Sequence, residues 1–247
     1  PAPAGRMPVV MAAEAGGTMV HEACGHGLEA DLAQKGLSVY ANRQGEQVAS
    51  ELVTVIDDAT LPGKYGSARY DDEGTPCRRK ILIDRGELKQ YLHSLITARK
   101  AGTDPNGSGR RESYRFVPIP RMSNTFIAPG KDDPGRIVAE TDRGLYVTRM
   151  GGGQVNTANG DFVFEVAEGF LIENGEIGPA VRGATLTGNG PRSLGLVDRV
   201  GSDQGFTIGT CGKDGQGVPV SDAQPTLRIP ELIVGGTAHE PEGEEDL

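Results

Sequence analysis

GGTMVHEACGHG, residues 16–27, places two histidines and a glutamate close together in a chain that has only four histidines. Imidazole nitrogens are good zinc ligands, and a carboxylate beside a metal can accept a proton from a coordinated water. His21 and His26 are separated by five positions, whereas the helix of a typical zinc peptidase carries its two histidines four apart. The stretch is therefore either a variant metal-binding helix or a coincidence of spacing.

The five-residue spacing has a geometric consequence. In a regular α-helix it turns the second side chain by about 140° around the axis, so one ion could not touch both rings. Gly25 precedes the second histidine, and a residue without a side chain permits a π-type turn or a break. If one metal binds both histidines, the segment from His21 to His26 must depart from regular α-helix.

The surrounding sequence predicts a helix from Thr18, as its N-cap, to about Lys35, ended by Gly36 in a left-handed conformation. Glu29 follows His26 by three positions, on the same face of that helix. It could orient an imidazole by a hydrogen bond, but a solvated helix carboxylate is the interpretation we favour.

Outside this helix the hydrophobic pattern mostly has a period of two, which predicts strands, and glycine-containing turns predict hairpins. Pro1 to Met7 is expected to be a linker remnant. The predicted strands and hairpins cover residues 8–13, 52–56, 80–88, 144–147, 161–166, 170–177 and two short stretches in 223–236, with a short helix at 134–143. The expected fold is α+β, mostly antiparallel β-sheet with the metal-binding helix packed on it.

Composition excludes several classes of protein. The net charge of -9 and the lack of a basic stripe argue against direct nucleic-acid binding. Three widely spaced cysteines do not make a disulfide framework, which favours a reducing cytoplasm. No apolar run could span a membrane. Residues 238–247 are strongly acidic, and we expect this tail to be disordered.

The block from Gly16 to Asp31 resembles the signature of the TldD branch of the TldD/PmbA metallopeptidases. The resemblance continues in order along nearly the whole chain, in ASEL (49–52), DDEGTP (71–76), NGSGRRESY (106–114), PRMSNT (120–125), GGGQV (151–155), FVF (162–164), CGKDGQ (211–216), QPTL (224–227) and VGGT (234–237). The PmbA (TldE) branch lacks the histidine motif, so the match is to the metal-bearing partner.

The resemblance implies a domain organisation and partners. Only the carboxy-terminal half of the family is matched, so we expect an amino-terminal domain to be missing. Residues 1–13 would be the linker remnant and first strand, and residues 14–237 the TldD-like carboxy-terminal metallopeptidase domain. The family acts on unfolded peptides as a dimer, which is either a homodimer or a heterodimer with a PmbA/TldE-like subunit.

The same resemblance implies a metal site. His21 and His26 would bind zinc, and the resemblance places the metal-binding cysteine of the family at Cys211. Three protein ligands leave a fourth position for water. Glu22 would be the general base, while Cys24 is expected to be a small packed residue.

Other candidate residues have weaker support. Gly151-Gly152-Gly153-Gln154 is predicted to be a loop that lets the substrate backbone approach, because it lacks the lysine of a phosphate-binding loop. Cys77 is expected to be inert, and His93 and His239 are expected at the surface.

The sequence thus predicts a zinc-dependent peptidase that cleaves unfolded peptides with metal-activated water and a glutamate base. The alternative is a non-catalytic, metal-stabilised domain that binds a peptide or modulates a partner, as the label of gyrase modulator would suggest. Glu22 favours the enzyme, because a purely structural zinc site needs no base beside it.

Overall fold

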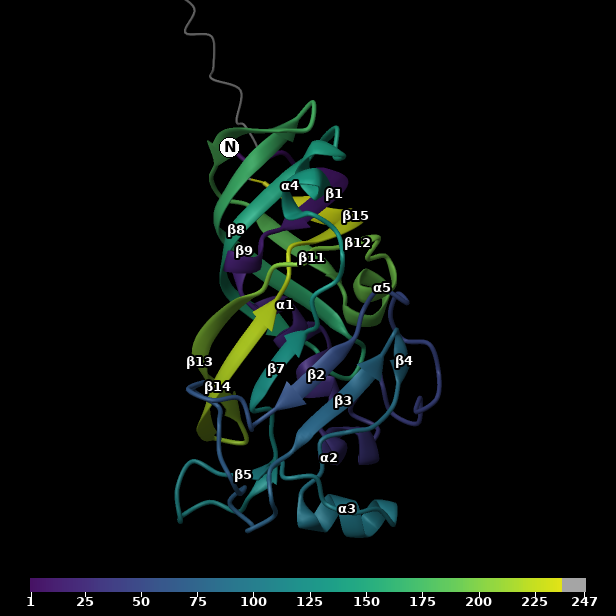
Figure 1. Cartoon of the computed structure of the whole chain (residues 1–247), viewed down its shortest axis with the longest axis vertical. Helices are drawn as coiled ribbons and strands as arrows, with labels where there is room; N and C mark the ends of the chain where they lie inside the picture. Colours follow the sequence, from purple (N-terminus) through teal and green to yellow (C-terminus); the bar gives the residue numbers. More distant parts are fainter. Residues whose placement is uncertain (237–247) are drawn as a thin grey trace, which may run out of the picture.

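The computed structural model describes residues 1–236, which form two large β-sheets placed one above the other along the long axis of the molecule, and a small two-stranded sheet of β5 and β6 (Figure 1). The acidic tail expected at 238–247, including His239, lies outside the described residues. The strands are β1 (Gly5–Met11), β2 (Val55–Asp58), β3 (Arg79–Asp84), β4 (Glu87–Leu88), β5 (Gly109–Arg110), β6 (Ile119–Pro120), β7 (Asn124–Ile127), β8 (Arg143–Val155), β9 (Asp161–Glu173), β10 (Glu176–Val181), β11 (Thr185–Asn189), β12 (Arg199–Val200), β13 (Gly205–Lys213), β14 (Gln216–Gln224) and β15 (Leu227–Gly235).

The helical segments are short. They are η1 (Ala13–Ala15), α1 (Thr18–Val20), η2 (His21–Gly25), η3 (His26–Leu28), α2 (Ala30–Gln34), α3 (Leu95–Ala101), α4 (Pro134–Ala139) and α5 (Gly190–Gly195). In residues 1–236, no helix combines the length and the apolar character needed to cross a membrane.

The upper sheet closes on itself. Its strands run in the order β1-β8-β9-β11-β15, and β15 pairs back with β1, so that five strands form a ring. Only the β1–β8 pair is parallel in this sheet. The strands alternate their side chains between two faces, and Leu145, Phe164 and Leu186 are fully buried in the core.

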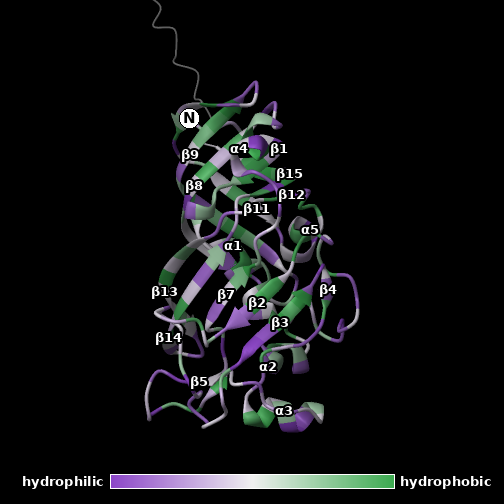
Figure 2. Cartoon of the chain, viewed as in Figure 1, coloured by the Kyte–Doolittle hydropathy of each residue, from purple (hydrophilic) through white to green (hydrophobic). Residues whose placement is uncertain are grey.

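The lower sheet has the order β13-β14-β7-β2-β3-β4 and is antiparallel except between β14 and β7. Figure 2 shows β3 changing from hydrophilic residues at its start to hydrophobic residues towards its end. The expected α+β fold, dominated by antiparallel sheet, is confirmed. Both predicted hairpins are also confirmed, with turns at Arg85-Gly86 and Asn174-Gly175 in which all four residues have positive φ.

The predicted helix from Thr18 to Lys35 is wrong as a single helix. It divides into α1, the π-helical turn η2, the 3-10 turn η3 and α2, with Glu29 extended between η3 and α2. The predicted departure from α-helix after His21 is therefore confirmed. The N-cap is Gly17 and not Thr18. Close packing requires a glycine there, since a Cβ on Gly17 would lie 2.2 Å from the backbone nitrogen of Ala223.

Several predicted boundaries also change. Residues 5–7 are not a linker, because β1 starts at Gly5 opposite Val234. The predicted strand at 52–56 appears as β2, three residues later, and the predicted helix at 134–143 ends at Ala139, since β8 already starts at Arg143. The predicted loop at Gly151–Gln154 lies within β8, where irregular pairing with β9 lets the strand continue through the glycines.

One hydrophobic core joins both sheets to the histidine segment. Val20, Cys24 and Leu28 belong to the same buried cluster as Leu82 of β3 and Phe164 of β9. In Figure 1 the label of α1 lies where the two sheets meet. The histidine segment is thus held between the sheets and not on the surface of one of them.

Two glycines offer a matched test of the β3–β4 turn. Gly86 and Gly63 have φ of 81° and 70°, but a Cβ on Gly86 would lie 2.3 Å from the Ala49 carbonyl oxygen, while a Cβ on Gly63 meets nothing within 4 Å. Gly63→Ala should lower the free energy of unfolding by about 1–2 kcal/mol through backbone strain. Gly86→Ala should lower it by a further ~1–3 kcal/mol through overpacking. Urea denaturation followed by circular dichroism measures both, and equal losses would contradict the tight contact with Ala49.

Candidate metal centre

A widened helical turn brings the two histidines to one side. The N–H of His26 donates to the carbonyl of His21, five residues back, which is the hydrogen bond of a π-helix. Gly25 lies inside this turn, where a Cβ would come within 2.2 Å of Met122 Sδ. The glycine is therefore required by close packing as well as by the turn.

Neighbouring side chains satisfy polar groups of the widened turn. The Tyr40 hydroxyl donates to the Ala23 carbonyl at 2.9 Å, and the Cys24 thiol donates to the Val20 carbonyl at 3.3 Å. Both donors are almost completely buried. A buried carbonyl without a donor would cost stability, so these contacts support a turn that is not regular α-helix.

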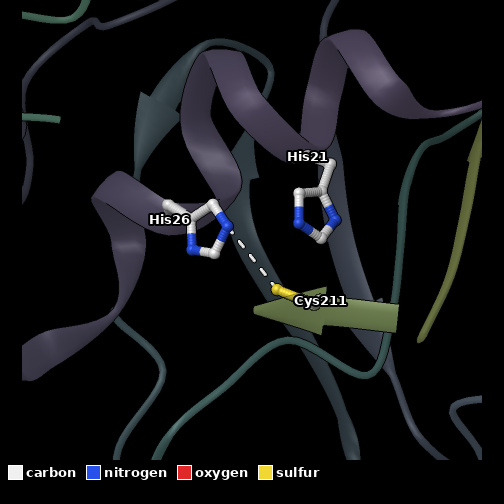
Figure 3. Close-up of side chains that lie close together, drawn as sticks. All are labelled: His21, His26 and Cys211. Carbon is white, nitrogen blue, oxygen red and sulfur yellow. Dashed lines mark hydrogen bonds between the residues drawn. The ribbon is translucent and has the colours of Figure 1, made fainter. Parts of the chain in front are cut away.

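The turn faces strand β13, and there His21, His26 and Cys211 come together (Figure 3). One ligand atom from each residue lies within 4.8 Å of the other two. His26 Nε2 lies 3.5 Å from Cys211 Sγ, and the two imidazole centroids are 4.9 Å apart at an angle of 84°. Three good zinc ligands thus converge on one point, from segments that are 185 residues apart in the sequence.

Each imidazole is oriented by a carboxylate on its other nitrogen. His21 Nδ1 donates to Asp222 Oδ1 at 2.9 Å, and His26 Nδ1 donates to Glu29 Oε2 at 3.1 Å. With Nδ1 occupied in this way, Nε2 of each ring is left for the shared point. A carboxylate in this position is the usual partner of a metal-binding histidine.

The protonation of the three groups reflects their contact. Burial would lower the pKa of His26, but Glu29 and Cys211 outweigh it and raise the pKa to about 10. Asp222 and Cys211 likewise overcome burial and raise the pKa of His21 well above its usual value. Burial would raise the pKa of Cys211, but the two histidines lower it to about 6. The cluster therefore combines a thiolate with two protons that a divalent cation could replace.

Glu22 lies in the same turn, between the two histidines, and is half-buried. Within residues 1–236 its carboxylate makes no hydrogen bond or ion pair, and it does not belong to the three-residue metal group.

Glu29 is not the solvated helix carboxylate that we favoured. It is fully buried, because the extended backbone at this residue turns its side chain towards His26. Lys213 and Arg121 lie beside it, at 3.0 and 3.7 Å. Burial would raise the pKa of Glu29, but His26, Lys213 and Arg121 together lower it.

The surface position predicted for His93 is wrong, since this residue is only 7% exposed. It precedes α3. Its ring Nδ1 lies 3.2 Å from Thr97 Oγ1, and its backbone N–H donates to Asn106 Oδ1. Cys24 is packed as predicted, and burial raises its pKa to about 12. Burial also raises the pKa of the half-buried Cys77 thiol.

The four residues Gly151–Gln154 do not belong to the metal group. Gln154 instead lines a cavity of about 580 Å³, together with Phe162 of β9 and Arg192 of α5. Gly151 is half-buried, and the other three residues are exposed along β8.

Sequence reasoning missed Asp222, Lys213, Arg121 and Tyr40. Lys213 follows Cys211 by two positions in β13, so strand periodicity could have placed both on one face. The Asp214-Gly215 turn could have indicated the β13–β14 hairpin, whose register puts Asp222 on that face as well. No local pattern identifies Arg121 or Tyr40, because their contacts depend on the complete fold.

The chain is similar to known metallopeptidases. Residues 4–236 match the family model described as the PmbA/TldA metallopeptidase C-terminal domain. A metalloprotease TldD homolog of Haemophilus influenzae is 44% identical over 96% of this chain and 49% of its own length. A zinc metalloprotease TldD homolog of Saccharolobus solfataricus is 33% identical over 94% of this chain and 52% of its own length.

Solved structures give the same relationship. A Thermotoga maritima protein described as a candidate modulator of a DNA gyrase superposes with a TM-score of 0.80 and 31% identity, over 95% of this chain and 50% of that one. TldE from Thermococcus kodakarensis gives 0.78 and 25%, over 96% and 51%. This chain thus spans about half the length of the relatives it matches.

Zinc binding at about pH 7 should release about two protons per ion from the imidazoles, because both rings start protonated while the thiol has largely lost its proton, and part of a third proton from the coordinated water. Affinity should therefore rise with pH until His26 loses its proton, at about pH 10. Isothermal titration calorimetry in two buffers of different ionisation enthalpy counts the protons. Release of one proton or none would show that the rings are neutral before the metal binds.

Proposed function

The chain belongs to the TldD/PmbA metallopeptidase family, and from this premise we propose that it is the zinc-dependent catalytic part of a peptidase that cleaves unfolded peptides. The observation that carries the proposal is the convergence of His21, His26 and Cys211 within 4.8 Å. Half of the length of its relatives lies outside the match, so the activity concerns the whole protein.

The donor set fits zinc. Two imidazole nitrogens and a thiolate suit this borderline-soft ion, and three protein ligands are typical of catalytic rather than structural zinc sites. The carboxylates of Asp222 and Glu29 fix the rings in the required orientation. When bound, zinc lowers the pKa of a coordinated water to about 7 and polarises a carbonyl.

We assign proton transfer to Glu22. Glu22 extends from the turn that carries both histidines, and its carboxylate is free of other partners among residues 1–236. It accepts a proton from the attacking water and delivers that proton to the leaving amine. Glu22 is half-buried, so its side chain stays accessible to solvent.

The strand that carries Cys211 supports the proposed substrate class. β13 is the last strand of the lower sheet, so its second edge is unpaired among the described residues. Ile208 of this strand is 73% exposed. An extended peptide could pair with such an edge by β-augmentation, which a folded protein cannot do. Gly151–Gln154, in the exposed part of β8, are a second candidate contact for the substrate peptide.

We further propose a dimer, either of identical subunits or with a PmbA/TldE-like subunit, acting in the cytoplasm. The three cysteines are free, which suits a reducing compartment. The alternative function is a metal-stabilised domain that binds a partner without cleaving it. The description of the similar Thermotoga maritima protein as a candidate gyrase modulator supports this alternative.

Removal of one cysteine should identify the ligand. Cys211→Ala should reduce zinc from about one ion per chain to a small fraction, because only two protein ligands remain. Cys24→Ala is the matched control, since Cys24 is also a buried free cysteine, but its thiol donates to a backbone carbonyl and it does not belong to the metal group. Inductively coupled plasma mass spectrometry gives the zinc content. Loss of zinc in Cys24→Ala, with full zinc in Cys211→Ala, would contradict the assignment.

Glu22→Gln should separate the enzyme from the binding domain. The variant keeps the size of the side chain but cannot accept the proton, so hydrolysis of unfolded peptides should fall by about 10²–10⁴. Zinc content and peptide binding should stay at the level of the parent. Glu14→Gln, in an exposed position seven residues before His21, should keep full activity.

The assay requires the full protein together with its partner subunit. Equal cleavage by Glu22→Gln and the parent would exclude Glu22 as the base. A zinc-loaded parent that binds unfolded peptides but cleaves none of them would replace the peptidase by the non-catalytic binding domain.

A further inference from the structure

Behind His26 lies a buried cluster of charges that the peptidase mechanism does not use. Glu29 is fully buried, Arg121 is fully buried, and the Lys213 side chain is 7% exposed. Removing charges from water is costly unless partners compensate for it, so such a cluster calls for a specific role. The cluster contacts both His26 and Cys211, which connects it to the geometry of the metal group.

Lys213 joins strand β13 to the histidine segment. Its ammonium group lies 3.0 Å from Glu29 Oε2 and 2.7 Å from Asp31 Oδ1, and it donates to the Pro120 carbonyl at 3.2 Å. Three acceptors match the three N–H groups of an ammonium ion. Glu29 Oε2 is also the atom that accepts from His26 Nδ1. A single carboxylate oxygen therefore holds both the ligand imidazole and the lysine.

Arg121 makes the second connection. Its Nη2 donates to the Cys211 carbonyl at 2.5 Å, and its Nη1 donates to the Gln216 carbonyl at 3.3 Å. Its Nε lies 3.7 Å from Glu29 Oε1, which is too far for a hydrogen bond but close enough for charge attraction in a buried site. The planar guanidinium group thus links the backbone of one ligand to the carboxylate that orients another.

Both connections join the histidine segment to strand β13. His26 belongs to the helical segment, Cys211 belongs to β13, and Lys213 is two positions further along the same face of that strand. Glu29, Lys213 and Arg121 consequently form a brace between the two segments. His21 lacks such a brace, since among residues 1–236 its carboxylate partner Asp222 makes no ion pair with a lysine or arginine.

We propose that Lys213 and Arg121 are positioning residues of the metal centre, which hold Glu29 against His26 and Cys211 against the histidine segment before a metal binds. This inference rests on the proposed metal site and names two residues that determine its geometry. Neither side chain belongs to the metal group itself. Loss of either connection leaves the ligands present but less ordered, so each binding event must first order them.

The experiment compares two buried lysines in the cobalt-substituted protein. Lys213→Met removes the brace, whereas Lys80→Met removes another ion-paired lysine, with a side chain 1% exposed, that lies 2.8 Å from Asp57 and does not belong to the metal group. Lys213→Met should weaken Co²⁺ binding by about 10–100-fold, the usual effect of losing a residue that orients a ligand. Its visible d–d and thiolate-to-cobalt absorption bands should also shift. Lys80→Met should lower thermal stability and keep the Co²⁺ affinity and spectrum of the parent.

A second variant covers a failure of Lys213→Met to fold. Arg121→Lys keeps the positive charge but cannot reach two carbonyls in a planar fork, so it should also weaken Co²⁺ binding and alter the spectrum. Variants that fold and show the affinity and spectrum of the parent would overturn the brace and leave the metal site intact. A parent that binds no Co²⁺ would overturn both. A parent that binds Co²⁺ without cleaving peptides, together with a weakened Lys213→Met, would support the brace and reject only the peptidase.

Discussion

The requirement that two side chains five positions apart face the same point governs the architecture of this protein. An α-helix cannot meet it, so the chain adopts one π-helical turn from His21 to Gly25. Such a turn is stable only when other groups bond its backbone and fill the space around it. Tyr40 supplies a hydrogen bond, and Met122 packs where a side chain on Gly25 would stand. The two sheets enclose the turn, and the core of the protein is also the support of its metal group.

The origin of the residues in the centre explains why a complete fold is needed. The histidines come from the first part of the chain, and Cys211 and Asp222 come from the hairpin near its other end. Between them in the sequence lie β2 to β12, which belong to both large sheets, while β1 and β15 at either end of the chain close the ring of the upper sheet. Joining segments so distant in sequence carries a large entropic cost, which the shared hydrophobic core offsets. Stability and site geometry are therefore coupled throughout the molecule.

Local patterns were sufficient for some features and insufficient for others. The hairpins at 80–88 and 170–177 followed from turn residues whose positive φ leaves few alternatives. The turn at His21–His26 followed from helix geometry together with the hypothesis that one metal binds both histidines. The helix predicted to Lys35 failed at Glu29, because contacts with Lys213 and Arg121, distant in sequence, outweigh local helix propensity. His93 was misplaced for a different reason, since its contacts with the nearby Thr97 and Asn106 leave no mark in the local hydrophobic pattern. The convergence of Cys211 with the histidines could be expected from family resemblance, but spacing could not reveal it.

The β13–β14 hairpin determines two parts of the centre at once. Its pairing sets Cys211 opposite Val218 and Thr207 opposite Asp222, so the thiol and the acceptor of His21 share one face. In a β-hairpin, insertion of a single residue at the turn shifts one strand against the other and exchanges the two faces of that strand. A length change at Asp214-Gly215 would therefore separate the thiol from the carboxylate, although neither residue had been substituted. Natural variation in this protein should consequently tolerate changes of residue type at the hairpin tip far better than changes in its length.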